Sequence, residues 1–389
     1  MKKILYDIEQ LIMANGKETG ICRVSLEVLH AIEKNENFDV YPIVTTNKGC
    51  NAEEYLKSKG LNSFAEKVVY LPHLKKTTQK HNLYKAFCSY VQELKYKKKY
   101  LRELNKYDEY ISIFSPISPI VYSSNLKTKL IVHDLIPIKF PQYCAKKFVH
   151  KYKCWVQAIR ADKIICDSKA TKQDFLYYRP DYKNKDVNVV YLAASDKYSP
   201  QSADNIKQKY NINTEKYILS VSDHNPRKNF THLIDAFAKF LDISKATDIS
   251  LAIVGPKARD SENIKNIIEK HSKYKDKIII TGFVDDKDMP ALYSTAEMFV
   301  FPSLYEGFGL PILEAMKCGT PVISSNNSSL PEVGGNAPLY ISGTDIEETA
   351  KAIEHLYNNK NICNEMKKNG FKQAQKFNWA QTSNDIFNL

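Results

Sequence analysis

Short apolar runs alternate along the chain with longer segments of helical periodicity. Runs such as 249–254 and 277–281 are apolar at consecutive positions, which is typical of strands covered on both faces of a parallel sheet. The segment 229–241 instead places its apolar residues on one helix face. The pattern predicts strands at 4–8, 38–44, 67–71, 110–114, 129–133, 163–167, 187–192, 217–222, 249–254, 277–281, 298–302, 321–324 and 339–341.

This alternation predicts an α/β fold with two Rossmann-like doubly wound domains that face each other across a cleft. It is interrupted once, by the polar stretch 193–204. We therefore expect an N-terminal domain over 1–195, a second Rossmann-like domain over 196–375 and an amphipathic C-terminal helix over 376–389. Ligands of such sheets bind outside the carboxyl ends of the strands, so candidate residues are expected to follow strands.

The composition excludes or disfavours several classes of protein. The 389 residues are 43% hydrophobic and include 17 Phe and 25 Tyr, which excludes a disordered chain. No apolar run reaches the ~18 residues of a transmembrane helix and the start lacks an apolar signal core, so we expect a cytoplasmic protein. The eight cysteines show neither a C-x-x-C pair nor zinc spacing, which favours reduced thiols over disulfides or structural zinc.

The chain is basic, with 56 Lys and Arg against 44 Asp and Glu and a formal net charge of +12. Only six of these cations are Arg. A protein that reads nucleic acid would use more Arg for bidentate contacts to bases and phosphates. The composition therefore disfavours nucleic acid as a partner.

Much of the positive charge gathers in the segment 74–106, which has ten cations and two acids. Its apolar residues repeat at heptad-like spacing, which predicts an amphipathic basic helix. One interpretation is a helix that covers the core of the first domain and keeps its Lys side chains in water. The other is contact with an anionic membrane surface, at ~1 kcal/mol per cation near the surface.

The most informative pattern lies in the segment 301–321. A predicted strand is followed by a Gly-x-Gly turn, and Pro311 then suits the first position of a helix. The glycines allow close approach of a ligand, and the helix start offers free N–H groups to a phosphate. Carboxylates flank the turn, and we expect them to bind sugar hydroxyls because they would repel phosphate. The candidate residues are Glu306, Gly307, Phe308, Gly309, Leu310 and Glu314.

A second strand–turn–helix segment contains Ser222, Arg227 and Lys228. We expect the two cations at the start of a helix, where adjacent positive charges are unfavourable against the helix dipole unless an anion is bound. A guanidinium fork beside an ammonium group matches a diphosphate through charge-assisted hydrogen bonds. The alternative is an exposed basic helix start without a ligand.

Two further residues follow strands in the first half of the chain. Gly20 opens a predicted helix after the first strand, where its backbone N–H groups suit a phosphate or a sugar. His133 ends the strand predicted at 129–133. Taken alone, each residue is equally consistent with a structural role.

Together these segments resemble family 4 of the GT-B nucleotide-sugar glycosyltransferases, particularly its bacterial mannosyltransferase-like branch. The likeness covers most of the C-terminal half. It is thinner in the first half, where it rests on Thr19-Gly20-Ile21, His133-Asp134 and Asp167-Ser168-Lys169. The matching C-terminal segments are 222–229, 254–255, 281–283, 302–316, 319–323 and 329–333.

The resemblance implies a role for each polar candidate. Glu314 would bind the ribose hydroxyls of the donor nucleotide, and Glu306 with the backbone of 307–309 would hold the donor sugar. Arg227 and Lys228 would neutralise the diphosphate. The residues implied in catalysis are His133, Glu306, Arg227 and Lys228.

The remaining donor contacts are implied in the same way. N–H groups at Leu310 would assist the cations, and backbone around Phe283 and Val284 would bind the base. His133 would contact the transferring sugar, and Gly20 would touch phosphate or acceptor. The first domain would bind the acceptor, the second the donor, and the helix 376–389 would cross back to the first domain.

The implied activity is transfer of a hexose, with mannose favoured, from a nucleoside-diphosphate sugar to a saccharide or polyprenyl-linked saccharide acceptor. Such a protein would work in surface polysaccharide or lipopolysaccharide assembly and retain the anomeric configuration. It would need no cofactor or metal, and GDP-mannose is favoured over a UDP-sugar as donor. It would be cytoplasmic, and peripheral on the inner face of the cytoplasmic membrane if the basic segment binds lipid. The alternative is a sugar-nucleotide epimerase of the same fold, which would need acid and base groups at the sugar carbon.

Overall fold

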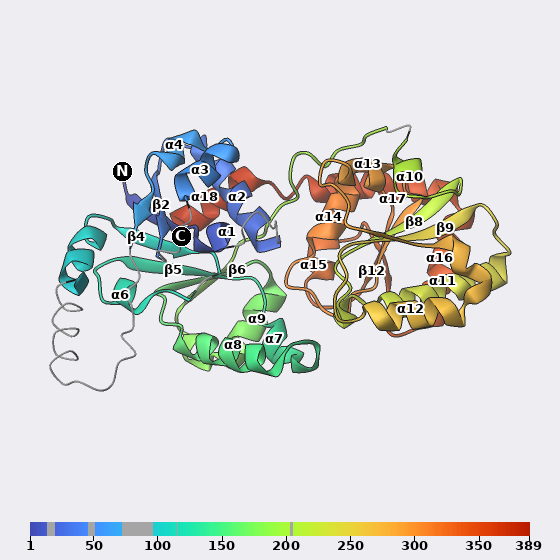
Figure 1. Ribbon diagram of the computed structural model, residues 1–389, viewed down its shortest axis with the longest axis horizontal. Coiled ribbons are helices and arrows are strands. Elements are labelled where there is room, and N and C mark those ends of the chain that lie inside the picture. Colours follow the sequence, from blue (N-terminus) through green and yellow to red (C-terminus); the bar gives the residue numbers. More distant parts are fainter. Residues whose placement is uncertain (14–19, 46–50, 72–95, 115, 203–204) are drawn as a thin grey trace.

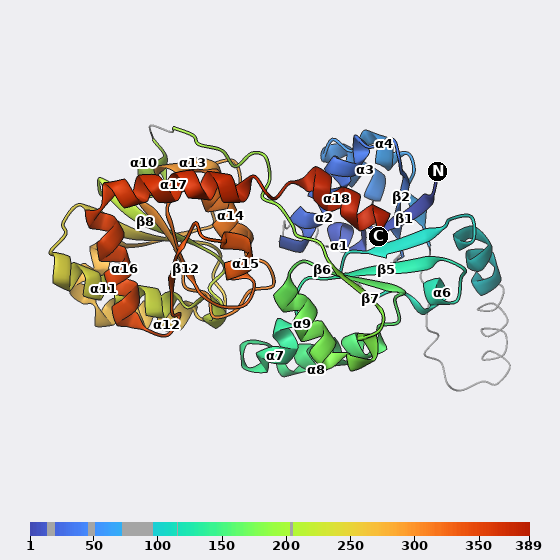
Figure 2. The same cartoon turned by 180° about the vertical axis from the view of Figure 1, so that it is seen from behind.

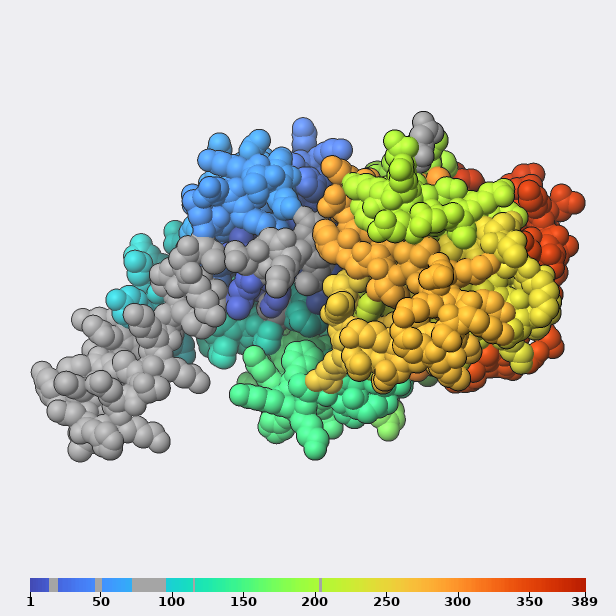
Figure 3. Space-filling view, turned by 45° about the vertical axis from the view of Figure 1, so that its right-hand side comes forward, coloured from blue at the N-terminus to red at the C-terminus, as the bar shows by residue number. Residues whose placement is uncertain are grey.

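The computed structural model describes residues 1–13, 20–45, 51–71, 96–114, 116–202 and 205–389. It has two lobes side by side, each a parallel sheet with helices on both faces (Figures 1 and 2). The space-filling view shows the two lobes in contact with each other (Figure 3). This architecture confirms the predicted fold class of two Rossmann-like doubly wound domains.

The first lobe is built on a sheet of order β3-β2-β1-β4-β5-β6-β7, in which every pair is parallel. Its strands are β1 Lys3–Asp7, β2 Asp39–Val44, β3 Val69–Tyr70, β4 Glu109–Ser112, β5 Lys127–Val132, β6 Lys163–Cys166 and β7 Asp186–Val189. Its helices include α1 Glu9–Met13, α2 Gly20–Glu33, α3 Ala52–Ser58, α4 Asn62–Ala65, α6 Pro119–Tyr122, α7 Ile136–Lys139, α8 Lys146–Ala158 and α9 Lys169–Tyr178.

The second lobe has a sheet of order β10-β9-β8-β11-β12-β13, again parallel throughout. Its strands are β8 Lys216–Val221, β9 Ile249–Val254, β10 Ile278–Gly282, β11 Met298–Phe301, β12 Val322–Ser325 and β13 Leu339–Ile341. Its helices include α10 Ile206–Lys209, α11 Phe230–Ser244, α12 Ser261–Lys270, α13 Met289–Thr295, α14 Leu310–Lys317, α15 Leu330–Gly334, α16 Ile346–Asn358 and α17 Lys360–Ala374.

The strands form where the sequence is apolar at consecutive positions, because helices cover both faces of each sheet. In β9, for example, every residue is buried. Each strand predicted from the sequence is present among the described residues, with ends that differ by at most a few positions. The strand expected at 110–114, for instance, ends at Ser112.

Both sheets reverse their strand order beside the first strand of the lobe, between β1 and β4 and between β8 and β11. A crevice forms outside the carboxyl ends of strands at such a switch point. Gly20 begins α2 after β1, Arg227 follows β8, and Glu306 follows β11. The topology thus brings these three segments to the facing edges of the two lobes.

The C-terminal helix α18, Trp379–Asn388, leaves the second lobe and packs against α2 in the first (Figures 1 and 2). Its Phe387 ring stacks on the Tyr6 ring, with centroids 6.0 Å apart. The buried amine of Lys129 donates to the Phe387 carbonyl at 2.9 Å and pairs with Glu109 at 2.9 Å. A cation at the last carbonyls of a helix is favourable, so this end of the chain is fixed inside the first lobe.

The predicted basic segment 74–106 is described only in part, because residues 74–95 lie outside the described ranges. Residues 96–104 form a helix that buries Tyr100 and Leu104 and exposes Lys97, Lys98 and Lys99 to solvent. Within the ranges given above, no helix is both long and apolar enough to cross a bilayer.

Candidate active site

A cavity of about 250 Å³ lies between the lobes, at the facing carboxyl ends of their strands. The first lobe contributes polar groups from the ends of β5 and β6 and one face of α2. The second lobe contributes the glycine turn and the start of α14. The predicted site residues that line the cavity are Gly20, His133, Glu306, Gly307, Phe308, Gly309, Leu310 and Glu314.

Glu306 is the centre of a buried cluster of charges in the second lobe. Its side-chain oxygen Oε1 lies 2.8 Å from Arg227 Nη1 and 2.7 Å from Lys228 Nζ. The Ser303 hydroxyl donates to the same oxygen at 2.6 Å. The resemblance implied that Glu306 would hold the donor sugar and the two cations the diphosphate, and here the carboxylate is in direct contact with both cations.

The electrostatics of this cluster favour the charged form of Glu306 although its side chain is buried. Burial alone would raise the pKa of Glu306, but Arg227 and Lys228 outweigh it and lower the pKa to about 2. Burial, with Arg227 beside it, lowers the pKa of Lys228. One carboxylate thus pairs with two cations, while Asp134 and Asp223 also act electrostatically on Arg227.

The backbone around the two cations differs from the prediction. Arg227 and Lys228 lie on a short 3-10 turn, Pro226–Lys228, rather than at the first positions of α11. Asn229 follows with φ of 65°, in the left-handed region, and only then does α11 begin at Phe230. The sharp change of direction turns both side chains toward Glu306 instead of along the helix axis. Helix α14 likewise starts one residue before Pro311.

Glu314 is held by residues that the sequence argument did not assign. Arg23 Nη2, on α2 of the first lobe, lies 2.5 Å from Glu314 Oε1, and the Tyr293 hydroxyl donates to Oε2 at 3.0 Å. Arg23 also donates to the Tyr198 hydroxyl at 3.0 Å. The available signal was that Arg23 is one of six Arg in a Lys-rich chain and lies three residues after Gly20.

His133 lines the cavity just after β5, and the carboxylate of Asp167 orients its ring. Its Nδ1 lies 3.2 Å from Asp167 Oδ2, and burial raises the pKa of Asp167 to about 6 against the hydrogen bond from His133. His133 Nε2 is buried and has no hydrogen-bond partner among the described residues. A buried polar atom left in this way indicates a place for a ligand or water group.

Gly307 brings the two lobes into backbone contact. Its carbonyl accepts hydrogen bonds from the hydroxyls of Ser168 at 2.6 Å and Thr171 at 3.2 Å, both from the first lobe. A Cβ at position 307 would lie 2.1 Å from the His133 carbonyl oxygen, far inside contact distance. The glycine is therefore required by packing across the interface.

We expect Gly307→Ala to force the lobes apart. The His133 backbone must move to admit the methyl group, and overpacking of this kind destabilises by about 1–3 kcal/mol. Denaturant unfolding will measure the free-energy loss, and small-angle X-ray scattering will measure the larger radius of gyration. Gly20→Ala is the matched control, because its Cβ would meet nothing within 4 Å. Equal behaviour of the two variants would contradict the expectation.

Five predicted donor residues do not line the cavity: Ser222, Arg227, Lys228, Phe283 and Val284. Arg227 and Lys228 instead pair with Glu306, which does line the cavity. Ser222 ends the segment after β8 and hydrogen-bonds through its backbone N–H to Val254 O at 2.9 Å. Phe283 follows β10 with 77% of its surface exposed, whereas Val284 beside it is buried. Of the segments quoted for the resemblance, Thr19 lies outside the described residues.

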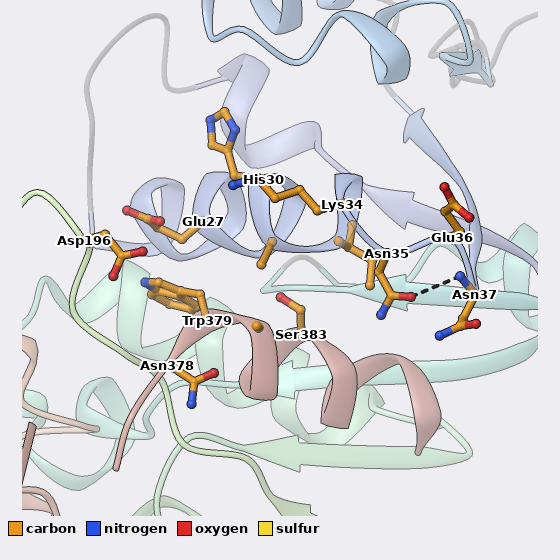
Figure 4. A pocket seen from close by; sticks show the side chains of 13 residues that line it. Glu27, His30, Lys34, Asn35, Glu36, Asn37, Asp196, Asn378, Trp379 and Ser383 are labelled. Atoms are coloured by element: carbon orange, nitrogen blue, oxygen red, sulfur yellow. Dashed lines mark hydrogen bonds between the residues drawn. The ribbon is translucent and has the colours of Figure 1, made fainter. Parts of the chain in front are cut away.

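A larger cavity of about 670 Å³ lies away from this cleft, between α2 and α18 (Figure 4). Its lining mixes the charges of Glu27, Lys34 and Asp196 around the indole of Trp379. It shares no residue with the cleft cavity, so we do not assign the donor to it. Within the described ranges, no three His, Cys, Asp or Glu side chains are grouped so that they could hold a metal ion.

Comparison with known proteins places this geometry in a family. The model for glycosyl transferases group 1 matches residues 202–373. The serotype-specific mannosyltransferase WbdA of Escherichia coli is 31% identical over 273 residues, which cover 66% of this chain and 32% of WbdA. The chain thus spans about a third of the length of WbdA.

Two further comparisons cover more of the matched protein. The O-antigen chain mannosyltransferase B of Escherichia coli is 30% identical over 260 residues, covering 66% of this chain and 68% of the relative. The structure of Anabaena HepE in complex with UDP and glucose superimposes with a TM-score of 0.71 at 16% identity, over 100% of this chain and 99% of HepE. These matches confirm the resemblance to GT-B glycosyltransferases drawn from the sequence, and they show that the chain belongs to the glycosyl transferases group 1 family, with the GT-B fold.

Proposed function

We propose that the chain is a retaining glycosyltransferase of family 4, which moves a hexose from a nucleoside-diphosphate sugar to a saccharide acceptor. The observation that carries this proposal is the buried cluster in which Arg227 and Lys228 meet Glu306 beside the glycine turn. Two cations and one carboxylate suit a ligand with an anionic diphosphate next to a polyhydroxylated sugar. The buried Glu306 carboxylate beside the cleft would be only weakly screened by solvent, which strengthens such interactions.

In this proposal the ligand exchanges partners with the buried charges. The diphosphate takes the hydrogen bonds of Arg227 and Lys228 that Glu306 now accepts, and the freed Glu306 carboxylate accepts from sugar hydroxyls. Departure of the nucleoside diphosphate is the demanding step, because negative charge builds up on the leaving oxygen. Preformed cations stabilise that charge, and we propose that no metal or cofactor is required.

The two residues at the cleft edges complete the donor site. Glu314 accepts from the ribose hydroxyls once Arg23 has moved away from it. His133 offers Nε2 to the transferring sugar, while Asp167 fixes the ring through Nδ1. The departing phosphate accepts the proton of the acceptor hydroxyl on the same face, which retains the anomeric configuration.

We favour mannose as the sugar and GDP-mannose over a UDP-sugar as the donor. The support is that WbdA and mannosyltransferase B are named as mannosyltransferases. By the same reasoning the acceptor is a saccharide or polyprenyl-linked saccharide of surface polysaccharide assembly, reached from the cytoplasmic side. The exposed Lys97, Lys98 and Lys99 would then meet the anionic inner leaflet.

A panel of nucleotides tested by thermal shift examines the proposal directly. A ligand at a hundred times its Kd stabilises the folded chain by about 2.7 kcal/mol, so GDP, UDP and ADP with their sugar conjugates are ranked by Tm. We expect Arg227→Ala to weaken the nucleoside diphosphate strongly and the bare nucleoside hardly at all. A panel in which no nucleotide raises Tm would overturn the proposal.

The epimerase alternative is not favoured, because the relatives reported above are named as transferases. Incubation with the nucleotide sugar alone separates the two activities. Isomerised sugar formed without any acceptor would indicate the epimerase, whereas sugar transfer that needs an added saccharide supports the glycosyltransferase.

A further inference from the structure

A carboxylate of the second lobe reaches across the interface to the start of a helix in the first. Glu332, on α15, accepts hydrogen bonds from the backbone N–H groups of Lys169 at 2.9 Å and Ala170 at 3.0 Å. The Tyr191 hydroxyl donates to the same carboxylate at 3.2 Å. Helix α15 lies on the side of its lobe that faces α9 (Figures 1 and 2).

The contact satisfies groups that the helix itself cannot pair. The first N–H groups of an α-helix have no partner one turn earlier, and they carry the positive end of the helix dipole. In α9 the N-cap Ser168 accepts only from Thr171 N, at 3.0 Å. Glu332 therefore supplies the acceptor for two further N–H groups, those of Lys169 and Ala170, with a full negative charge at the favourable end.

The start of α9, which Glu332 holds, also orients His133. Asp167, which binds His133 Nδ1, comes directly before the N-cap Ser168, whose hydroxyl donates to the Gly307 carbonyl. Residues 167–171 thus contact His133 within the first lobe. They also hydrogen-bond to the Gly307 carbonyl and to Glu332 in the second lobe. A shift of the start of α9 would move both the imidazole and its contact with the second lobe.

We propose that Glu332 is a positioning residue, which fixes the start of α9 when the lobes close and so sets His133 against the glycine turn. Glu332 itself does not line the cavity, and the hydrogen bonds described above join it to Lys169, Ala170 and Tyr191. When the lobes separate, its carboxylate and the two N–H groups return to water, and Asp167 loses the support of the opposite lobe. The catalytic part of this inference rests on the proposed function, whereas the positioning of His133 can be tested without turnover.

The test compares Glu332→Ala and Glu332→Gln with a matched control, Glu348→Gln. Glu348 accepts from a backbone N–H, that of Ser342 at 2.7 Å, within its own lobe. Hydrogen exchange of the peptide 168–178 and the ¹⁵N shifts of the His133 imidazole are measured on the whole chain, with and without GDP. We expect faster exchange and a changed His133 signal in Glu332→Ala, a smaller change in Glu332→Gln, and none in Glu348→Gln.

Turnover provides the second readout. Loss of hydrogen bonds to a charged group corresponds to about a 10- to 150-fold change, which we expect in kcat of Glu332→Ala, with KM for the nucleotide sugar nearly unchanged. Glu332→Gln retains one acceptor and is expected to recover part of kcat. Unchanged exchange and an unchanged His133 signal would overturn the inference. A wild-type chain without turnover would overturn only the proposed function, because the exchange and ¹⁵N measurements still decide the contact.

Discussion

Glu306→Gln is expected to lower the free energy of unfolding at pH 7 by about 3–5 kcal/mol, because it leaves two buried cations without their carboxylate. The amide can still accept from Ser303, so the decrease in the free energy of unfolding measures the effect of the lost charge and not of a changed side-chain shape. Denaturant unfolding measures it. Glu348→Gln is the control, since the Glu348 side chain is exposed and accepts from the backbone N–H of Ser342.

The same variant has a characteristic dependence on pH. Because the pKa of Glu306 falls from 4.5 to about 2 in the folded chain, its carboxylate stabilises the fold above about pH 4.5. That contribution is lost as pH falls from about 4.5 through 2. The stability difference between wild type and Glu306→Gln is therefore expected to shrink over this window. A difference that stays constant from pH 6 to pH 2 would contradict the buried ion cluster.

Added nucleoside diphosphate is expected to restore part of the stability lost in Glu306→Gln. The freed cations can donate to the phosphates in place of the carboxylate, so GDP should raise the Tm of the variant more than that of the wild type. The bare nucleoside lacks this charge and should not do so. Equal Tm shifts with GDP in both proteins would argue against diphosphate binding at Arg227 and Lys228.

Glu314→Gln is expected to weaken both nucleoside and nucleoside diphosphate by about 10- to 150-fold, because hydrogen bonds to a charged acceptor are lost. Arg23→Gln is expected to act in the opposite direction on the nucleoside. In the ligand-free chain Arg23 occupies the Glu314 oxygen that a ribose hydroxyl would use, so its removal frees the carboxylate. Calorimetric titration with guanosine and uridine measures both effects.

Arg102→Gln serves as the control for charge, because Arg102 is exposed on the helix 96–104. The affinity of the Arg102→Gln variant for guanosine and for uridine should equal that of the wild type. If Glu314→Gln binds nucleosides as tightly as the wild type, the ribose assignment is wrong. If Arg23→Gln weakens them, Arg23 belongs to the binding site itself and does not compete for Glu314.

The fold could be predicted well because its strands are buried on both faces. Such strands are apolar at nearly every position, and this pattern can be recognised in the sequence without knowing which strands are adjacent in the sheet. Strand ends were less certain, as at β4, because the last residues of a strand share their chemistry with the loop that follows. The helix 376–389 was visible as amphipathic, the resemblance implied that it crosses back to the first domain, and its packing on α2 agrees with this.

The chemistry of the site could be predicted in part. Glu306 and Glu314 stood out because they flank a glycine turn, and Arg227 and Lys228 because adjacent cations at a helix start are unfavourable without an anion. Their pairing could not be predicted, since the partners lie 78 residues apart in one case and 291 in the other. Arg23 was missed because the residues around it in the sequence do not indicate that its partner, Glu314, lies in the opposite lobe.

The crossing of α18 has a consequence for how the chain acquires its structure during synthesis. The first lobe includes Phe387 in its core, yet the ribosome makes this residue only after the entire second lobe. The first lobe must therefore wait with an uncovered apolar surface on α2 while its neighbour folds, and a chaperone could bind that surface in the interval. Folding of the two lobes is thus coupled in time, although each has its own sheet.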